Sequence, residues 1–193
     1  MELQTGDRVL VTGATGMVGS HVAERSLGMG VATRVVVRRP EAAAWLADLG
    51  VEVVEGDMTD GESLSRALEG VTVVIHCAAK VGDWGPVEDY REVNVGGLKA
   101  LIDAACATGV LKRFVHISSL GVYEARDHHG TDETEPPCRT GIDGYTLTKV
   151  ESEDLAVSRF DPDTFPLVVL RPGFVYGSRD RNVLPRLVES LES

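Results

Sequence analysis

The amino-acid sequence predicts an α/β fold with one parallel sheet that is covered by helices on both faces. Short β-branched runs alternate with helical patterns along the chain, and this alternation is typical of parallel sheets. One run, residues 71–79, is almost continuously apolar, as a strand buried on both faces requires. The rule of right-handed crossovers then leaves few topologies. With 193 residues, the chain is long enough for one domain with a substantial core.

Six segments are predicted to be strands. They are short runs of apolar and β-branched residues, and several of them end in glycine or in polar residues that stop the run. In chain order they are residues 8–13, 31–39, 51–57, 71–79, 111–119 and 165–173.

Helices are predicted between these strands. Residues 17–29 carry apolar side chains at helical spacing, and residues 40–50 begin with proline and end with glycine, the usual asymmetry of helix ends. Residues 59–70 open with polar capping residues and close on glycine. The remaining helices are predicted over 86–108, over 143–159 and from 183 onward. Residues 120–142 form the one long irregular segment, and loops of that length are usually functional or mobile.

Composition and charge narrow the class of partner. A formal net charge of −11 and a pI of about 4.9 argue against nucleic acid and anionic membranes, because both need a basic surface. The N-terminus shows no signal-peptide pattern, and no apolar run is long enough to span a bilayer. The three cysteines and the histidines follow no zinc or disulfide pattern. We expect a cytoplasmic protein with reduced thiols, no metal and a small-molecule substrate.

A glycine-rich loop joins the first predicted strand to the first helix. Gly13, Gly16 and Gly19 recur at a spacing of three in "VTGATGMVGS". Gly13 would permit the tight turn, Gly16 would let the backbone approach a pyrophosphate, and Gly19 would let the helix pack close to the sheet. Because the helix N-terminus also offers free N–H groups to an anion, the loop predicts a dinucleotide site. Its lining is expected to include Thr15, Met17 and Val18 as well.

This loop resembles that of the extended branch of the short-chain dehydrogenase/reductase superfamily, with GxxGxxG in "TGATGMVG" in place of the commoner GxGxxG. The resemblance extends over the whole chain and implies a Rossmann-type doubly wound sheet that binds NAD(H) or NADP(H). It also implies a C-terminal substrate domain. Residues 1–177 are expected to form the dinucleotide-binding domain with the catalytic residues. Residues 178–193 are expected to form only the start of the substrate domain, which would be largely absent.

The end of the second predicted strand bears on the choice of cofactor. In "VVVRRPE", Arg38 and Arg39 stand where an acidic residue would bind the ribose 2′-hydroxyl and repel a 2′-phosphate. Arginine matches the geometry of a phosphate group. We therefore favour NADP(H), while NAD(H) stays open because two solvated arginines after a strand are not rare.

The resemblance implies further contacts with the cofactor. Asp57 matches the family aspartate that accepts a hydrogen bond from the adenine amino group, with Met58 beside it. A helix cap is an equally good interpretation of Asp57. The "HCAA" segment should pass beneath the cofactor, and "LRPGFVYG" resembles the segment that lines the nicotinamide carboxamide. The residues concerned are Cys77, Ala78, Ala79, Pro172, Gly173 and Val175.

Tyr145 and Lys149 lie four residues apart in "GYTLTK", which puts both on one helical face. By itself this spacing fits two solvated residues. The superfamily, however, has a Tyr-x-x-x-Lys pair on the helix after the fifth strand, where these two residues occur. The charge of Lys149 should lower the pKa of Tyr145 from about 10 and allow proton exchange with a substrate near neutral pH. Lys149 would also hold the nicotinamide ribose hydroxyls.

Two polar residues complete the implied catalytic set. The family serine lies three residues before a Val-Tyr pair, which in "VHISSLGVY" selects Ser119 and leaves Ser118 as the runner-up. Ser119 would hydrogen-bond the reacting oxygen and orient it. Asn94 in "VNVGG" matches the helix asparagine that supports the lysine through a water in the superfamily. An ordinary polar helix residue is the alternative for Asn94.

The stretch "AAKVGDWGPVEDYREVNVGG" resembles the group of 3β-hydroxysteroid dehydrogenase/isomerases and bacterial 3-oxo-acid reductases, and "NVLPRLVE" fits that group too. The resemblance implies hydride transfer between the nicotinamide cofactor and a secondary alcohol or ketone. Sugar-nucleotide epimerases, dehydratases and dihydroflavonol-type reductases share the same catalytic residues. A dinucleotide-binding module without catalysis is a second class of function that stays open, and so does a homodimer.

Overall fold

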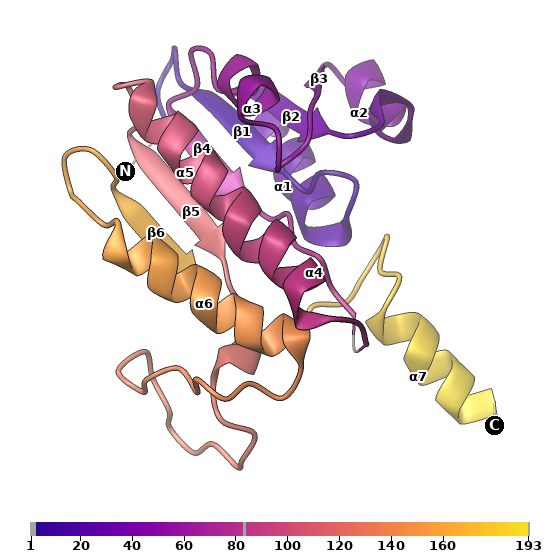
Figure 1. The fold of residues 1–193 in the computed structure, drawn as a ribbon. Helices are drawn as coiled ribbons and strands as arrows, with labels where there is room; N and C mark the ends of the chain where they lie inside the picture. The colour runs from indigo at the N-terminus through magenta and orange to yellow at the C-terminus, as the bar shows by residue number, and fades with distance from the viewer. Residues whose placement is uncertain (1–2, 83, 193) are drawn as a thin grey trace.

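Six strands form one parallel sheet in the computed structural model, which describes residues 3–82 and 84–192. Across the sheet the order is β3-β2-β1-β4-β5-β6, so the direction of winding reverses between β1 and β4 (Figure 1). This order confirms the predicted doubly wound Rossmann-type fold. The strands are β1 Arg8–Thr12, β2 Ala32–Val37, β3 Glu52–Glu55, β4 Val73–His76, β5 Arg113–Ile117 and β6 Leu167–Leu170.

The register of the strands brings the predicted site segments to one edge of the sheet. Thr12 at the end of β1 pairs with His76 at the end of β4, and His76 pairs with His116 near the end of β5. On the far side of β5, Ile117 pairs with Leu170, the last residue of β6. The glycine loop and the segments that follow β4, β5 and β6 therefore begin side by side at the carboxyl edge, where open α/β sheets bind ligands.

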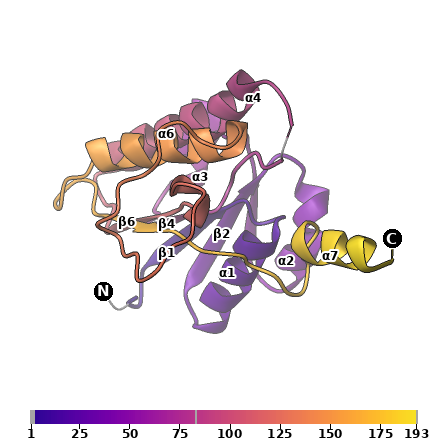
Figure 2. The same ribbon diagram turned by 90° about the horizontal axis from the view of Figure 1, so that it is seen from below.

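Helices cover the sheet in two layers. The helices α3, α4–α5 and α6 lie on one face, and α1 and α2 lie on the other (Figure 2). The helical elements are α1 Met17–Gly28, η1 Pro40–Ala43, α2 Ala44–Asp48, α3 Gly61–Ala67, α4 Val87–Arg91, η2 Glu92–Gly96, α5 Gly97–Ala107, η3 Leu120–Val122, α6 Gly144–Ser158 and α7 Val183–Glu192.

Two predicted helices differ in detail from the structure. The segment predicted as one helix over 86–108 is continuous, but its middle turn, Glu92–Gly96, is a π-helix. The segment predicted as one helix over 40–50 is a 3₁₀ turn followed by a short α-helix, because Ala43 leaves the helical conformation with φ −117° and ψ 11°. Both irregularities bury a residue, Asn94 in the first and Ala43 in the second.

The core is divided by the sheet into two clusters. The larger cluster lies under α3, α5 and α6, and the smaller lies under α1 and α2, next to β1, β2 and β3. On β5 the residues alternate between buried and half-buried, and β6 is half-buried or exposed along its length. Representative members of the larger cluster are Leu64, Leu98, Ile102, Phe114 and Phe165, and those of the smaller are Val11, Ala23, Val35 and Leu46.

The last helix, α7, extends away from the sheet on the side of α1 and α2 (Figures 1 and 2). Its apolar residues recur at helical spacing and are exposed; they are Leu184, Leu187, Val188 and Leu191. A search of the described residues for a helix with the length and apolar character of a membrane span found none.

Candidate functional site

The glycine loop after β1 is built on close backbone contacts. Gly13 has φ +70°, and a Cβ atom there would lie 2.7 Å from the backbone nitrogen of Ala78. A Cβ on Gly19 would lie 2.6 Å from the carbonyl carbon of Gly13. These distances leave no room for a side chain at either position. The tight turn at Gly13 and the close approach of the helix at Gly19 are therefore both present, and the Cys77–Ala78 segment lies directly against the loop.

The N-terminus of α1 is open to an anion. Gly16 is the N-cap, and within the described residues no side chain caps this helix and no acidic residue occupies its first turn. Thr15 and Gly16 are exposed, while Met17 and Val18 are half-buried. Uncapped N–H groups at the start of a helix of 12 residues suit a phosphate group. The residues present therefore fit the pyrophosphate of a dinucleotide.

Thr12, which sequence reasoning did not single out, ties this loop to β4. Its hydroxyl accepts a hydrogen bond from the backbone nitrogen of Ala78 at 3.2 Å and lies 2.8 Å from Nδ1 of His76. Because the oxygen already accepts from Ala78, the hydroxyl hydrogen is available to donate to His76. The residue before the first motif glycine is therefore a buried cross-link between β1 and the segment after β4.

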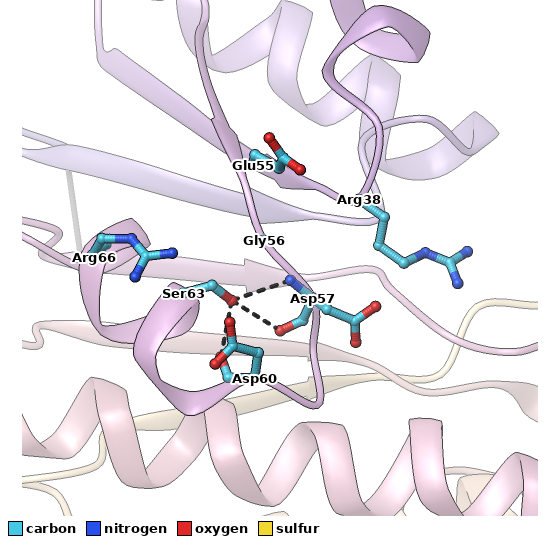
Figure 3. A pocket seen from close by; sticks show the side chains of 7 residues that line it. All are labelled: Arg38, Glu55, Gly56, Asp57, Asp60, Ser63 and Arg66. Atoms are coloured by element: carbon cyan, nitrogen blue, oxygen red, sulfur yellow. Dashed lines mark hydrogen bonds between the residues drawn. The ribbon is translucent and has the colours of Figure 1, made fainter.

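The adenosine end of the predicted site lies beside a depression of about 340 Å³ between the ends of β2 and β3 and helix α3. Arg38, Asp57 and Arg66 are among its lining residues, and Figure 3 shows Arg38 and Asp57 extending toward the same side. Arg38 and Arg39 are both exposed, but only Arg38 lines the described depression. Of the two predicted arginines, Arg38 is thus the one beside Asp57.

Asp57 caps the turn that follows it. Its Oδ1 accepts hydrogen bonds from the backbone nitrogen of Thr59 at 2.9 Å and from the Thr59 hydroxyl at 2.7 Å, and these bonds lower the pKa of the carboxyl group. Asp57 therefore acts as a cap in the fold, which was the second interpretation of this residue from the sequence. Met58 is half-buried and packs against α5, where a Cβ on Gly97 would lie 3.0 Å from the Met58 Cβ.

Helix α6 begins with a capping box that fixes the position of Tyr145. The Asp143 carboxylate accepts from the backbone nitrogen of Thr146 at 2.7 Å, and the Thr146 hydroxyl accepts from the backbone nitrogen of Asp143 at 3.0 Å. This reciprocal arrangement is a strong helix start. Tyr145 consequently lies in the first turn, next to the carboxyl end of β5.

The two serines after β5 point in different directions. The Ser119 hydroxyl accepts from the backbone nitrogen of Gly121 at 3.0 Å and lies close enough to the Tyr145 phenol to lower its pKa. Ser118 is buried and donates to Glu153 at 2.7 Å. Ser119 is therefore the serine that shares a site with Tyr145, whereas Ser118 belongs to the interior.

The pKa of Tyr145 differs from the sequence-based expectation. Burial raises it, the Ser119 hydroxyl lowers it, and the Asp143 charge raises it again, for a net increase. The sequence-based prediction that Lys149 lowers the pKa of Tyr145 was therefore wrong, because burial raises this pKa instead. The Lys149 ammonium lies 5.9 Å from the centroid of the Tyr145 ring and donates to the Ile117 carbonyl at 2.8 Å.

Lys149 is the most deeply buried charge among the predicted catalytic residues, with only 4% of its surface exposed. Burial lowers the pKa of Lys149 to about 8, against the opposing influence of Cys77 and Glu153. A buried amine resists protonation because its charged form, the ammonium, would lose its hydration. At pH 7 the lysine still carries its charge, but its pKa of about 8 lies close to this pH.

Asn94 links the segment after β4 to helix α6. From the π-helical turn its side-chain nitrogen donates to the Lys80 carbonyl at 3.1 Å and to the Thr148 hydroxyl at 3.0 Å, and its oxygen accepts from the Lys80 backbone nitrogen at 2.7 Å. π-helical turns are frequent at functional sites. The contact of Asn94 with α6 is therefore to Thr148, the neighbour of Lys149.

The segment after β6 lies beside the turn that holds Ser119. The Pro172 carbonyl accepts from the backbone nitrogen of Leu120 at 2.9 Å, and a Cβ on Gly173 would lie 3.1 Å from the Leu120 side chain. Val175 is exposed. Pro172 and Gly173 thus lie beside the turn that contains Ser119, while Val175 lies further along the segment.

An ion pair that the sequence analysis missed lies under the site. Glu153 has 4% of its side chain exposed, and its Oε1 accepts from Nε of Arg171 at 2.9 Å. Arg171 also donates to the Tyr123 hydroxyl at 2.6 Å. The one signal in the sequence is that Glu153 follows Lys149 by four residues, a spacing too common to select it.

Two buried histidines, His76 and His116, lie beside Lys149. The His76 and His116 rings stack with their centroids 5.5 Å apart. Burial is the main cause that lowers both pKa values, to about 3 for His116, and the nearby Lys149 charge lowers them further. Both rings are therefore neutral near pH 7. His128 and His129 are exposed in the long loop.

Comparison with known proteins gives one consistent family. The sequence profile of the NAD-dependent epimerase/dehydratase family matches residues 9–193. A 3β-hydroxysteroid dehydrogenase/Δ5→4-isomerase from Mycobacterium tuberculosis is 33% identical over 192 residues, which cover 95% of this chain and 51% of that protein. The chain thus spans about half the length of this relative.

Two solved structures agree with this result. A short-chain dehydrogenase/reductase superfamily protein from Agrobacterium tumefaciens with bound NAD is 34% identical, with a TM-score of 0.73 over 85% of this chain and 48% of that one. A Thermus thermophilus UDP-glucose 4-epimerase in complex with NAD is 30% identical, with a TM-score of 0.81 over 95% of this chain and 60% of that one. The chain belongs to the NAD-dependent epimerase/dehydratase family.

Proposed function

We propose that this chain carries the cofactor-binding and catalytic part of an NAD(P)-dependent oxidoreductase that interconverts a secondary alcohol and a ketone. The observation that carries the proposal is the grouping of Ser119, Tyr145 and Lys149 at the carboxyl edge of the sheet. The Cys77–Ala78 segment connects this group to the glycine loop, since it packs on Gly13 while Cys77 faces Lys149. A hydride donor held at the loop would therefore lie next to a proton donor.

Each residue has a distinct role in this proposal. The Ser119 hydroxyl orients the reacting oxygen of the substrate, and the Tyr145 phenol exchanges a proton with that oxygen. The Lys149 ammonium binds the ribose hydroxyls on the nicotinamide side and holds them near Tyr145. The nicotinamide cofactor, when bound, supplies the hydride chemistry, while the protein supplies binding and orientation.

For the cofactor we propose NADP(H), with Arg38 as the contact for the 2′-phosphate. Support comes from the exposed Arg38 side chain beside the Asp57 depression and from the lack of an acidic residue at the end of β2. The two solved relatives described above carry NAD. NAD(H) is therefore the alternative cofactor, and binding of NADPH has to be compared with binding of NADH.

For the substrate we propose an apolar alcohol or ketone of the 3β-hydroxysteroid or 3-oxo-acid type. Large apolar side chains are exposed near the catalytic residues, including Trp84 at 92% and Phe174 at 91%. The Trp84 carbonyl accepts from Tyr90, whose ring packs against Gly144, the neighbour of Tyr145. Such side chains suit a hydrophobic ring system or chain better than a charged sugar nucleotide.

A sugar-nucleotide epimerase is the second candidate. It is favoured by the likeness to the Thermus thermophilus UDP-glucose 4-epimerase, which extends over 95% of this chain. The two candidates differ in substrate and share the cofactor, so a screen separates them. Oxidation or reduction of a 3-hydroxy- or 3-oxosteroid or of a 3-oxo acid supports the first, and conversion of UDP-glucose to UDP-galactose supports the second. Cofactor binding with no conversion of either class supports a dinucleotide-binding module.

Calorimetric titration with NADPH and NADH tests the cofactor proposal. Arg38→Ala should lower NADPH affinity by about 10-fold to 100-fold and leave NADH affinity nearly unchanged, because a charged phosphate contact contributes roughly 1.5–3 kcal/mol. Arg39→Ala is the matched control, since Arg39 is also exposed but is not among the residues that line the depression. Equal losses of NADPH and NADH affinity in Arg38→Ala would contradict a 2′-phosphate contact.

A further inference from the structure

We propose that Glu153 is a positioning residue that holds the Ser119 turn and the segment after β6 against the face of α6 that carries Lys149, and that helps the Lys149 ammonium stay charged for the proposed reaction. The inference rests on the proposed function, because it concerns the same site. Glu153 is a buried carboxylate that has no role in the function proposed above. Glu153 lies one helical turn after Lys149 on α6 and therefore on the same face.

The contacts of Glu153 join three elements at one carboxylate. Its Oε2 accepts from the Ser118 hydroxyl at 2.7 Å, which fixes the backbone next to Ser119. Its Oε1 accepts from Arg171, the residue that follows β6 and precedes Pro172. Both oxygens are thus used, and each contact leads to a segment that carries a predicted site residue.

Arg171 extends this arrangement to the long loop. Its guanidinium donates to the Tyr123 hydroxyl at 2.6 Å and lies 5.0 Å from the centroid of the Tyr123 ring. Because a guanidinium presents several donors in a rigid plane, it holds Glu153 and Tyr123 at a fixed distance from each other. The turn that contains Ser119 is therefore held from two sides, by Ser118 and by Tyr123.

Glu153 is also a carboxylate one helical turn from Lys149 on the same face of α6, and its charge raises the pKa of that ammonium. The other titratable groups around that ammonium are Tyr145 on α6, His76 and Cys77 at the end of β4, and His116 on β5. Burial raises the pKa of Cys77 to about 12 and lowers those of the two histidines, so these three groups are neutral at pH 8. The negative charge of Glu153 raises the pKa of Lys149, whereas burial lowers it, and the carboxylate therefore helps the ammonium stay charged.

A purely structural ion pair is the alternative, since buried pairs of this kind often contribute to the fold alone. The two interpretations differ in the pH dependence of cofactor binding. If Glu153 supports the charge of Lys149, its loss should move the pH at which the ammonium is lost, whereas a structural pair should change the stability of the protein and leave this pH unchanged.

The experiment measures NADPH affinity of the whole chain between pH 6 and pH 10 by fluorescence titration. Wild-type affinity should fall as the pH rises through about 8, where Lys149 loses its proton. In Glu153→Gln the midpoint should lie lower by roughly one pH unit, the scale of a nearby opposite charge. Glu153→Asp, which keeps the charge, should return the midpoint toward the wild-type value.

Glu151→Gln is the matched control. Glu151 lies on the same helix and forms its own ion pair with Arg91, with two hydrogen bonds of 2.7 Å, away from Lys149. This variant should keep the wild-type midpoint. If Glu153→Gln does not fold, the neutral pair Glu153→Gln/Arg171→Met replaces it. Its midpoint should also lie below that of the wild type, but by less than in the single variant, because the positive charge of Arg171 is removed as well.

Three results would overturn the inference. A folded Glu153→Gln variant, or the double variant in its place, with the wild-type midpoint would show that the pair is only structural. An equal shift in Glu151→Gln would show that the effect is not specific to Glu153. A wild-type chain that binds neither NADPH nor NADH at any pH would remove the proposed function itself, and with it the inference.

Discussion

The glycine loop and the start of helix α6 lie at the same edge of the sheet, but different interactions build them. The loop consists of small residues in close backbone contact, with Gly19 packed on Gly13 and Gly13 packed on Ala78. The region around α6 consists of buried polar and charged side chains, with Lys149 and Glu153 among the residues that are nearly inaccessible to solvent. One half of the site therefore depends on shape, and the other half depends on charge.

This difference teaches where pH should matter. A steric contact between backbone atoms has no titratable group, so changes in the loop should act equally at all pH values. A buried charge is sensitive to every neighbour because the low dielectric of the interior strengthens electrostatic effects. Changes around α6 should therefore appear as changes in pH dependence, in addition to any change in affinity.

The largest expected effect is on proton transfer at the charged half. Tyr145→Phe removes the transferable proton and keeps the ring, so turnover of the substrate found in the screen should fall by roughly 10²–10⁴-fold. Cofactor affinity should stay close to that of the wild type. Glu151→Gln, a change on the same helix at a side chain that pairs with Arg91, is the control and should keep full turnover. Wild-type turnover in Tyr145→Phe would remove the tyrosine from the chemistry.

The second effect tests the charged half through stability. The pKa of Lys149 is lowered from 10.5 to about 8, so between these pH values the unfolded chain holds a proton that the folded chain has lost. The free energy of unfolding should therefore rise with pH across this window, and Lys149 should contribute about 3 kcal/mol to the rise. Denaturant unfolding of the wild type and of Lys149→Met at several pH values measures the difference.

Lys99→Met serves as the control for this experiment, because Lys99 is an exposed lysine paired with Asp103 on α5. It should keep the wild-type slope of stability against pH, whereas Lys149→Met should lose the rise between pH 8 and 10.5. A slope that is identical in all three proteins would mean that Lys149 titrates as a solvated lysine and that burial has no effect on it.

The smallest expected effect belongs to the shape-dependent half. Gly19→Ala puts a Cβ against the Gly13 carbonyl and should lower the free energy of unfolding by roughly 1–3 kcal/mol, equally at pH 6 and pH 9. Gly28→Ala, at the end of the same helix, meets open space and should be neutral or stabilising by roughly 0.4–1 kcal/mol. A loss in Gly19→Ala that depends strongly on pH would break the comparison.

The strands and most of the helices could be predicted because their signals are local. Alternation of apolar runs with helical patterns predicted the parallel sheet, and the glycine spacing predicted the loop before α1. The π-helical turn at Glu92–Gly96 could not be predicted, because its extra residue turns Asn94 toward Lys80 and Thr148, which come from other elements. The break at Ala43 likewise depends on burial against the sheet.

The sequence by itself determined the parallel α/β architecture, the contacts of the glycine loop and the position of Tyr145 and Lys149 on one helix. These features depend on residue type and on spacing within one element. Only the tertiary structure decided that Ser118 turns inward to Glu153, that burial raises the pKa of Tyr145, and that Glu153 pairs with Arg171 from another element. Desolvation and ion pairing depend on what surrounds a side chain, and that surrounding is assembled from segments that are distant in the sequence.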